Sequence, residues 1–489
     1  MHGRASGGVI IGIDQGSSST RCIVADAELR TLASASSPVT TLRPGPGMVE
    51  HDPEDVLRGV LGAMREALEA AGDPAVAAVG IATQTETFIL WDAESGDPAT
   101  GLISWQDQRA EETARALEEH AAAIEAATGL PLAPTFSAVK LAWLFEHEPG
   151  VLASAQSGQL LFGDVACWLS WRLSGGSAHV TEPSNACRTL LLDLDTLGWR
   201  DSLCEVFGVP RSMLPELRPS DRPGVLTNGE VAGFEAPIAA TLGDQPAALY
   251  GQGCTRPRMA ALTLGTGAFL WLNVGPDRPT APPGVLATVA WDAAAGRAYA
   301  LEAFGANAGN ALRLLRDLGL LGEPPSPAPD WSRPLPMLVP APAGLGTPHW
   351  HGADRITLLE AGSTTTRDAL SQSAVAGVAH QVADALDAQD ARVAIDVLRV
   401  GGGLAADEAL VQAIADLSGI ELEVSSAPEA TARGIVALAA AGAGLRPDED
   451  QAPAVARSVA PRLDPAGRER ERERWRRAVD VHVSETVGV

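Results

Sequence analysis

The sequence predicts an α/β protein of two lobes, and three observations support this prediction. The chain has 489 residues, more than a single domain usually holds. Helical and strand patterns alternate along it, as they do in α/β proteins. A strand, a glycine-containing turn and a second strand occur at Val9–Ala25, and the same pattern returns about 250 residues later at Met259–Val274. We therefore expect two related lobes, residues 1–245 and 246–489.

The other elements follow from the spacing of apolar residues. Asp52 is suited to cap a helix whose apolar residues recur from Val56 to Leu68. Further strands are expected at 77–81 and 88–91, and further helices at 111–127, 140–146, 407–417 and 430–441. The Pro-rich segment 323–348 excludes a regular helix but leaves room for one short strand. The mixture of Arg and Glu at 468–477 is typical of a solvated helix.

Composition excludes several classes of function. The formal net charge of −25 opposes binding to nucleic acid or to an anionic membrane. No apolar run is long enough to span a bilayer, and the N-terminus lacks the apolar region of a signal peptide. The five Cys are scattered, which indicates a reducing, cytoplasmic location. Lys140 is the single lysine among 36 basic residues, and we interpret this as a coding bias without functional weight.

Three glycine-containing turns are candidates for phosphate or nucleotide binding. Asp14 opens the turn Asp-Gln-Gly-Ser-Ser-Ser, where backbone N–H groups can approach a phosphate and the carboxylate can hold Mg²⁺. The other two turns are Gly265-Thr-Gly267 and Gly401-Gly-Gly403. An ordinary hairpin, or a loop without a ligand, stays an alternative for each of them. No GxxxxGK[ST] pattern occurs in the sequence, so a P-loop is excluded.

Two further groups of residues suggest a substrate that carries hydroxyls. Asp244 lies where a strand or loop meets the start of a helix, and a carboxylate there can take the proton from an attacking hydroxyl. Helix capping is the alternative role. Gln84, Thr85 and Glu86 follow a strand, and Trp105 lies in a polar segment. Polar side chains beside an indole suit a polyol, although a Trp also serves to anchor surface loops.

The order of these motifs resembles the FGGY carbohydrate kinases, and within them it is most similar to the glycerol kinases. The resemblance covers most of the chain and includes IGIDQGSSSTRCIVAD, HVTEPSNACRTLLLDLDTLGW, GDQPAALYGQ, LGTGAF and LRVGGG. It implies two actin-like (ribonuclease H-like) lobes with an interdomain catalytic cleft. It also implies transfer of the γ-phosphate of ATP, with Mg²⁺, to a hydroxyl of glycerol or a related small polyol. A homodimer or homotetramer stays open.

The resemblance implies roles for individual residues. Asp244 becomes the general base, and it shares the metal with Asp14, the two carboxylates facing each other from opposite lobes. The residues expected at ATP are Ser17, Ser18, Ser19, Arg21, Thr266, Gly309, Arg313, Gly403 and Asp407. The residues expected at the polyol are Gln84, Thr85, Glu86, Trp105, Thr135, Asp244, Gln245 and Phe269.

Four positions depart from the glycerol kinase pattern. Thr85 and Thr135 stand where glycerol kinases carry Arg and Tyr, so the pocket is larger and lacks two polar partners. We therefore hypothesise a longer polyol or a ketose as the substrate. Gly401 replaces an Asp, and Asp407 replaces an Asn that meets adenine. The alternatives are a kinase of another polyol, ketose or sugar acid in the same family, and an actin-like ATPase that uses no sugar.

Overall fold

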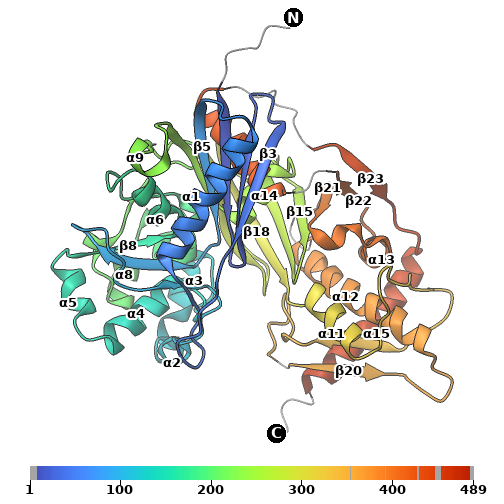
Figure 1. Ribbon diagram of the computed structural model, residues 1–489. Coiled ribbons are helices and arrows are strands. Elements are labelled where there is room, and N and C mark those ends of the chain that lie inside the picture. The colour runs from blue at the N-terminus through green and yellow to red at the C-terminus, as the bar shows by residue number, and fades with distance from the viewer. Residues whose placement is uncertain (1–7, 353, 391–392, 427–428, 446–452, 485–489) are drawn as a thin grey trace, which may run out of the picture.

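Two large β-sheets organise the protein (Figure 1). The computed structural model describes residues 8–352, 354–390, 393–426, 429–445 and 453–484. The first sheet is ordered β13 (Val225–Leu226), β14 (Pro237–Gly243), β5 (Val76–Thr83), β1 (Val9–Gln15), β2 (Ser19–Ala25) and β3 (Thr31–Pro38). The second is ordered β17 (Leu286–Ala293), β18 (Gly296–Gly305), β16 (Ala268–Gly275), β15 (Met259–Leu264), β21 (Val397–Gly401), β22 (Leu422–Ser425) and β23 (Val455–Val459).

The two predicted hairpins start the two sheets. β1 pairs with β2, and β15 pairs with β16, in each case antiparallel. β5 then adds to β1 in parallel, and β21 adds to β15 in the same way. The repeated pattern of strand, glycine turn and strand therefore predicted the start of each sheet correctly.

Helices from distant parts of the chain cover the first sheet. α1 (Pro53–Ala70) packs on β2 and β3, and Asp52 caps it as predicted by accepting hydrogen bonds from two backbone N–H groups of its first turn. α14 (Ala430–Gly442), near the other end of the chain, packs on β1, β5 and β14 and crosses α10 (Asp244–Gly251). A segment that lies between β22 and β23 of the second sheet in the sequence thus completes the first lobe, and the expected boundary at 245/246 falls inside α10.

A mainly helical region is inserted between β5 and β14. Its small sheet is ordered β4 (Glu50–His51), β7 (Leu102–Ile103), β6 (Phe88–Asp92) and β8 (Leu160–Asp164), and β4 joins it from a position before α1 in the chain. Its helical elements include α2 (Glu111–Ala116), η1 (Glu118–His120), α3 (Ala121–Thr128), α4 (Ser137–His147), α5 (Val151–Gln156), α6 (Val165–Leu173), α7 (Pro183–Ala186), η2 (Cys187–Thr189) and α8 (Asp201–Phe207). The prediction of one helix at 111–127 was wrong, because the 3₁₀ turn η1 separates α2 from α3.

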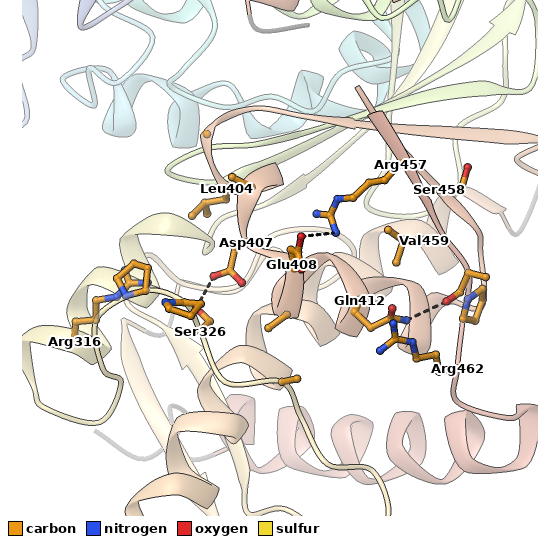
Figure 2. Close-up of a pocket in the computed structure, with 18 residues that line it drawn as sticks. Arg316, Ser326, Leu404, Asp407, Glu408, Gln412, Arg457, Ser458, Val459 and Arg462 are labelled. Atoms are coloured by element: carbon orange, nitrogen blue, oxygen red, sulfur yellow. Dashed lines mark hydrogen bonds and ion pairs between the residues drawn. The ribbon is translucent and has the colours of Figure 1, made fainter. Parts of the chain in front are cut away.

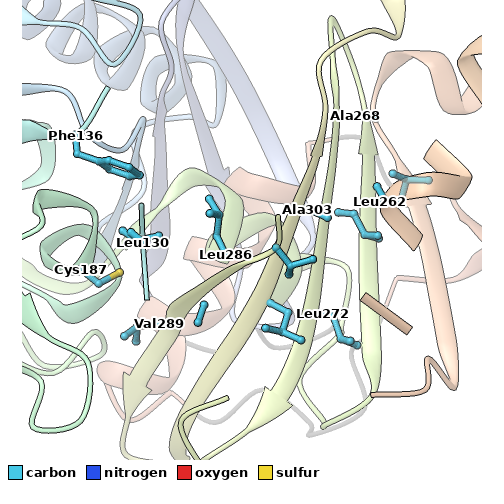
Figure 3. Packing of buried hydrophobic residues seen from close by; sticks show 14 of the residues in the cluster. Leu130, Phe136, Cys187, Leu262, Ala268, Leu272, Leu286, Val289 and Ala303 are labelled. Carbon is cyan, nitrogen blue, oxygen red and sulfur yellow. The ribbon is translucent and has the colours of Figure 1, made fainter. Parts of the chain in front are cut away.

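One hydrophobic core joins this helical region to the second sheet (Figure 3). Phe136 and Cys187 from the helical region belong to the same cluster as Leu286 and Val289 of β17. Polar contacts follow the same boundary, since the Tyr299 hydroxyl of β18 donates to a backbone carbonyl of the helical region at 2.8 Å. The edge formed by β17 and β18 is therefore attached to the first half of the chain.

The C-terminal helix is partly buried, which the sequence did not predict. α15 (Pro465–Ser484) places Arg472 and Trp475 in the interior, at 6% and 0% exposure. Both donate to Asp384 of α12 (Arg367–Asp390), at 2.6 and 2.7 Å, and the Trp475 ring stacks on His380. The expectation of a solvated helix was wrong, because a buried carboxylate partners an Arg that the charge pattern placed in water.

The remaining elements complete the second half. The Pro-rich segment contains one strand, β19 (Met337–Ala341), as predicted, and β19 pairs with β20 (Arg355–Leu359). α11 (Gly309–Asp317) follows β18, and α13 (Glu408–Ser418) follows β21 and the short turn η4 (Gly403–Ala406). Within the described part of the chain, every helix is too short or too polar to cross a membrane.

Candidate active site

Asp14 and Asp244 lie at the same edge of the first sheet. Asp14 belongs to β1 and pairs with Ala82 of β5, while Gly243 at the end of β14 pairs with Thr83 of β5. Asp244 follows as the first residue of α10, which confirms its predicted place where a strand meets a helix. The expectation that the two carboxylates belong to opposite lobes was wrong. Because β1 and β14 flank β5 in parallel, their carboxyl ends meet at one edge.

The two carboxyl groups share a crowded environment. Burial raises the pKa of Asp14 to about 6, although Arg21 acts in the opposite direction. Burial also raises the pKa of Asp244 to about 8, and the negative charges of Asp14 and Glu86 add to the increase. The Asp244 carboxylate accepts a hydrogen bond from the backbone N–H of Gln245 at 2.7 Å. Such a pair favours a proton or a metal cation between its members.

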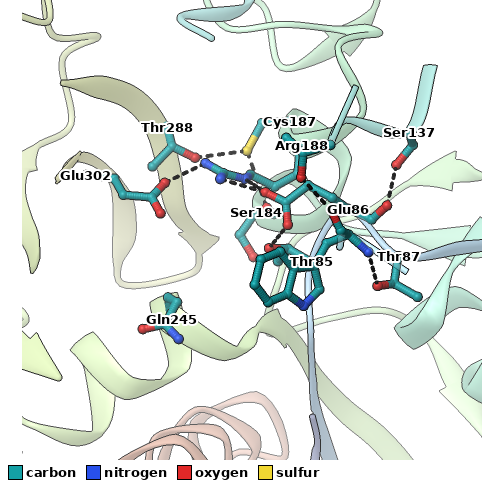
Figure 4. Close-up of polar contacts among 12 residues, drawn as sticks. Thr85, Glu86, Thr87, Ser137, Ser184, Cys187, Arg188, Gln245, Thr288 and Glu302 are labelled. Atoms are coloured by element: carbon teal, nitrogen blue, oxygen red, sulfur yellow. Dashed lines mark hydrogen bonds and ion pairs between the residues drawn. The ribbon is translucent and has the colours of Figure 1, made fainter. Parts of the chain in front are cut away.

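Glu86 is held by a network of polar contacts beyond the end of β5 (Figure 4). The Thr85 hydroxyl donates to one oxygen of the Glu86 carboxylate at 2.5 Å. Arg188 of η2 donates to the other oxygen at 2.6 Å and to Glu302 of β18 at 2.7 Å. Arg188 is only 6% exposed, so this guanidinium joins the helical region to the second sheet.

Sequence reasoning did not single out Arg188 or Glu302. Arg188 precedes the apolar run Leu190–Leu192, and a charged residue beside such a run is a signal for a buried ion pair. No comparable signal marks Glu302 within the strand pattern of β18.

Other residues expected at the polyol lie around Glu86. The Thr135 hydroxyl donates to the backbone carbonyl of Trp105 at 2.8 Å. Gln84 is buried, and its amide donates to Gln15 at 3.3 Å. Gln245, which follows Asp244, is half-buried. Phe269 lies on β16 of the second sheet, where its ring packs against Phe304 with the ring centroids 4.9 Å apart.

The first glycine turn exposes its serines. The backbone N–H of Gly16 donates to the carbonyl of Ser19 at 3.0 Å, which closes the turn between β1 and β2. Ser18 and Ser19 are exposed, and Ser17 is half-buried. Arg21 pairs with Asp14 in the strand register, and its guanidinium lies 3.4 Å from the Glu429 carboxylate, just before α14.

The other glycine segments converge at the end of β15. Thr266 accepts at its backbone carbonyl from the N–H of Asn310 at 3.1 Å, and Gly265 accepts from Gly309 at 3.0 Å. Gly402 has a φ of +88°, and a Cβ there would lie 2.4 Å from a backbone oxygen of β15. Only glycine tolerates this conformation at such close approach. The turn, the start of α11 and the glycines after β21 are therefore neighbours.

A cavity of about 1140 Å³ opens beside these glycines (Figure 2). Gly403 and Asp407 line it, together with Ser326 and Gln412. Asp407 caps α13 by accepting from the backbone N–H of Leu410 at 3.1 Å, and its other oxygen accepts from the Ser326 hydroxyl at 2.5 Å. Arg313 is exposed on α11 and is not among the residues that line this cavity.

Comparison with known proteins identifies the chain's relatives. Residues 9–251 match the N-terminal domain, and residues 260–443 the C-terminal domain, of the FGGY family of carbohydrate kinases. The glycerol kinase of Citrifermentans bemidjiense is 40% identical over 487 residues, covering 96% of this chain and 98% of that protein. The glycerol kinase of Thermus brockianus is 40% identical with the same coverage, 96% and 98%.

Solved structures share the fold over its whole length. The crystal structure of Plasmodium falciparum glycerol kinase with ADP has a TM-score of 0.91 at 27% identity, covering 97% of this chain and 98% of that one. A xylulose kinase from Lactobacillus acidophilus has a TM-score of 0.86 at 19% identity, covering 98% and 99%, and supports the fold alone.

The two sheets, together with the similarity to glycerol kinases over nearly the full length, define an ATP-dependent kinase with an actin-like fold. The chain belongs to the FGGY family of carbohydrate kinases. The family, the fold class and the enzyme class predicted from the sequence are thereby confirmed.

Proposed function

We propose that this kinase transfers the γ-phosphate of ATP to a hydroxyl of a small polyol, with glycerol as the first candidate, and that Asp244 is the general base. The observation that carries the proposal is the position of Asp244 at the start of α10, beside Asp14 and Glu86. A raised pKa suits a base that takes a proton from an alcohol near neutral pH. Relatives about 40% identical over nearly the full length are glycerol kinases, which supports glycerol.

Asp14 and Asp244 are also the residues that would hold Mg²⁺. The described residues contain no group of three or more His, Cys, Asp or Glu side chains arranged for a metal. Two carboxylates suit Mg²⁺ nevertheless, because it takes one or two carboxylates and completes its shell with water and substrate phosphates. When bound, Mg²⁺ neutralises charge on the phosphates. The elevated pKa values of both carboxyl groups fit a place prepared for a cation.

The ATP-binding residues are proposed from three neighbouring segments. The exposed Ser18 and Ser19, with Ser17 and Arg21, would meet the phosphates from the first lobe. Thr266 and Gly309 would meet them from the second sheet, at the turn after β15 and at the start of α11. The cavity lined by Gly403 and Asp407 would take the adenine base, and Arg313 of α11 is proposed as a further nucleotide contact.

Glu86, Trp105 and Gln245 are proposed to bind the polyol, with Gln84 and Phe269 around them. Glu86 can accept hydroxyl protons, and the Trp105 indole can cover C–H faces. The hydroxyls of Thr85 and Thr135 both donate to protein oxygens, so neither is a ready donor for a substrate. These two small side chains favour a second candidate function, phosphorylation of a longer polyol such as a pentitol.

Other properties are inferred on weaker physical grounds. The net charge of −25 favours a protein without a nucleic-acid partner and without an anionic membrane partner. We place it in the cytoplasm, since its five cysteines are all buried and free.

The test is release of ADP from Mg²⁺-ATP over a panel of glycerol, tetritols, pentitols, ketoses and sugar acids. Stimulation by a polyol is expected, whereas ATP hydrolysis that no polyol or sugar stimulates would contradict the proposal. In Asp244→Asn, kcat should fall by about 100-fold or more, because general bases contribute about 10²–10⁴. Polyol affinity measured by calorimetry should stay within a few fold. The exposed Asp277→Asn is the matched control, and an Asp244→Asn enzyme of normal kcat would disprove the base assignment.

A further inference from the structure

The single lysine of the chain is buried beneath the polyol residues. Lys140 lies on α4, and its side chain is 0% exposed. Every other one of the 36 basic residues is an arginine. Lysine is almost never fully buried unless its charge is compensated. The sequence alone suggested a coding bias, but the location of this one exception requires a structural reason.

The Lys140 ammonium contacts two segments of the proposed polyol pocket. It donates to the backbone carbonyl of Ser104 at 2.7 Å and to that of Glu86 at 3.4 Å. The nitrogen also lies 5.8 Å from the centre of the Phe88 ring, within the range of a cation–π contact. Ser137, one turn earlier on α4, donates to the same Glu86 carbonyl at 3.1 Å.

These contacts explain why a lysine stands here. An ammonium carries three donors on a compact centre and can direct them to two carbonyls and a ring face at once. The guanidinium of arginine is larger and planar, so it does not direct its donors to these two carbonyls and the ring face in the same way. The one lysine of the chain therefore stands where the contacts suit an ammonium better than a guanidinium.

The segments that Lys140 joins carry the proposed substrate contacts. Glu86 has a positive φ of 59°, a conformation that a residue with a side chain keeps only when its surroundings hold it there. Ser104 directly precedes Trp105, whose own carbonyl is held by Thr135. Hydrogen bonds from Lys140 to both segments thus fix the carboxylate of Glu86 relative to the Trp105 indole.

We propose that Lys140 is a positioning residue for polyol binding, which holds Glu86 and Trp105 at the separation that the substrate requires. The inference rests on the proposed function, since it takes these two residues as the polyol contacts. Lys140 acts through their backbones and takes no part in the transfer of the phosphate, so its removal should weaken polyol binding and leave ATP binding and the chemical step largely intact.

The charges around Lys140 support a role near neutral pH. The acidic groups that face it are Glu86 and Asp107, and Arg109 is the nearby cation. The negative charges of Asp107 and Glu86 favour the ammonium, whereas Arg109, which is paired with Asp107 at 2.8 Å, opposes it. Burial lowers the pKa of Lys140 to about 7. Deprotonation removes the charge that strengthens the hydrogen bonds to the two carbonyls, so the KM for the polyol should rise as the pH increases above 7.

The first test compares Lys140→Met with wild-type enzyme on the polyol that the wild type phosphorylates best. Methionine keeps the length and apolar stem of lysine but has no donor. We expect the KM for the polyol to rise about tenfold or more, as the loss of a charged hydrogen bond predicts, with kcat and the KM for ATP within about threefold. Ser137→Ala, which removes a neutral donor to the Glu86 segment and leaves the Ser104 segment untouched, should shift the same KM by less. Unchanged kinetics, or an equal rise in the KM for the polyol and the KM for ATP, would overturn the proposal.

The second test needs no variant and covers the case in which Lys140→Met does not fold. A protein labelled with [¹⁵N]lysine has one side-chain nitrogen signal, that of Lys140. Saturating polyol should shift this signal and raise its titration midpoint, whereas ATP alone should leave it in place. A signal that ignores the polyol overturns the positioning role while the panel of substrates still supports the kinase. If no polyol is phosphorylated, the proposed function fails and this inference fails with it.

Discussion

Replacing Gly434 by alanine should push helices α10 and α14 apart and displace Asp244, although Gly434 contacts no substrate. The two helices cross at a pair of glycines. A Cβ on Gly434 would lie 1.8 Å from the carbonyl oxygen of Ala247, and one on Gly251 would lie 1.9 Å from that of Ala430. Such atoms do not approach within 3.0 Å, so the helices must separate by about 1 Å.

The size of the effect follows from this displacement. Overpacking of a well-packed contact costs about 1–3 kcal/mol. At roughly 1 °C for each kcal/mol in a chain of 489 residues, the melting temperature should fall by about 1–3 °C. Asp244 begins α10, and a misplacement of about 1 Å in a catalytic group lowers the rate by about 100-fold. The loss of kcat should therefore exceed what the loss of stability explains at 25 °C.

The assay is thermal unfolding together with kcat on the best polyol. Gly62→Ala is the matched control, because Gly62 lies in helix α1 and a Cβ there would have no atom within 4 Å. That change should stabilise the protein by about 0.5–1 kcal/mol, as alanine favours a helix. If the Gly434→Ala protein had the same melting temperature and the same kcat as the Gly62→Ala protein, the close crossing of the helices would be refuted.

Three further predictions concern the site. The pKa of Asp244 is about 8 without ligands, and the base must be ionised. The kcat/KM for Mg²⁺-ATP reports the enzyme before the cation binds, so it should fall about tenfold per pH unit below pH 8. A flat profile of that parameter between pH 6 and 8 would contradict the role of Asp244. Asp407→Asn keeps the helix cap and adds a donor for adenine, so the KM for ATP should drop about tenfold. An increase in this KM would show that Asp407 does not contact adenine. Thr85→Arg adds a cationic donor beside Glu86 and should improve glycerol over pentitols by about tenfold, measured as the ratio of their kcat/KM values.

The local features of the site were predictable from the sequence. A strand, a polar glycine turn and a second strand placed Asp14 correctly, and the Gly-Asp-Gln-Pro segment placed Asp244 at a helix start. Both predictions depend on residues close together in the chain. Asp52 as a cap and the strand at 337–341 succeeded for the same reason.

The pairing of distant residues was not predictable. Arg188 and Glu302 are 114 residues apart and lie on different layers, so no spacing rule connects them. The relation between Asp14 and Asp244 failed for a related reason. Two hairpins suggested two independent lobes, whereas the parallel pairing of β14 with β5 returns the chain to the first sheet before α10 begins. Only the order of the strands decides which side of the site a residue occupies.

The return of α14 to the first sheet connects both ends of the candidate site to one helix. Thr431, in the first turn of α14, donates to the Asp244 carbonyl at 3.4 Å, and Glu429 just before it lies 3.4 Å from Arg21. One contact reaches the proposed base, and the other reaches the proposed phosphate turn. Because the glycines of the crossing with α10 hold α14 in backbone contact, a shift of this helix moves both contacts together. Phosphoryl transfer depends on the distance between the base and the phosphate, and α14 contacts the segments that carry both sides of that distance.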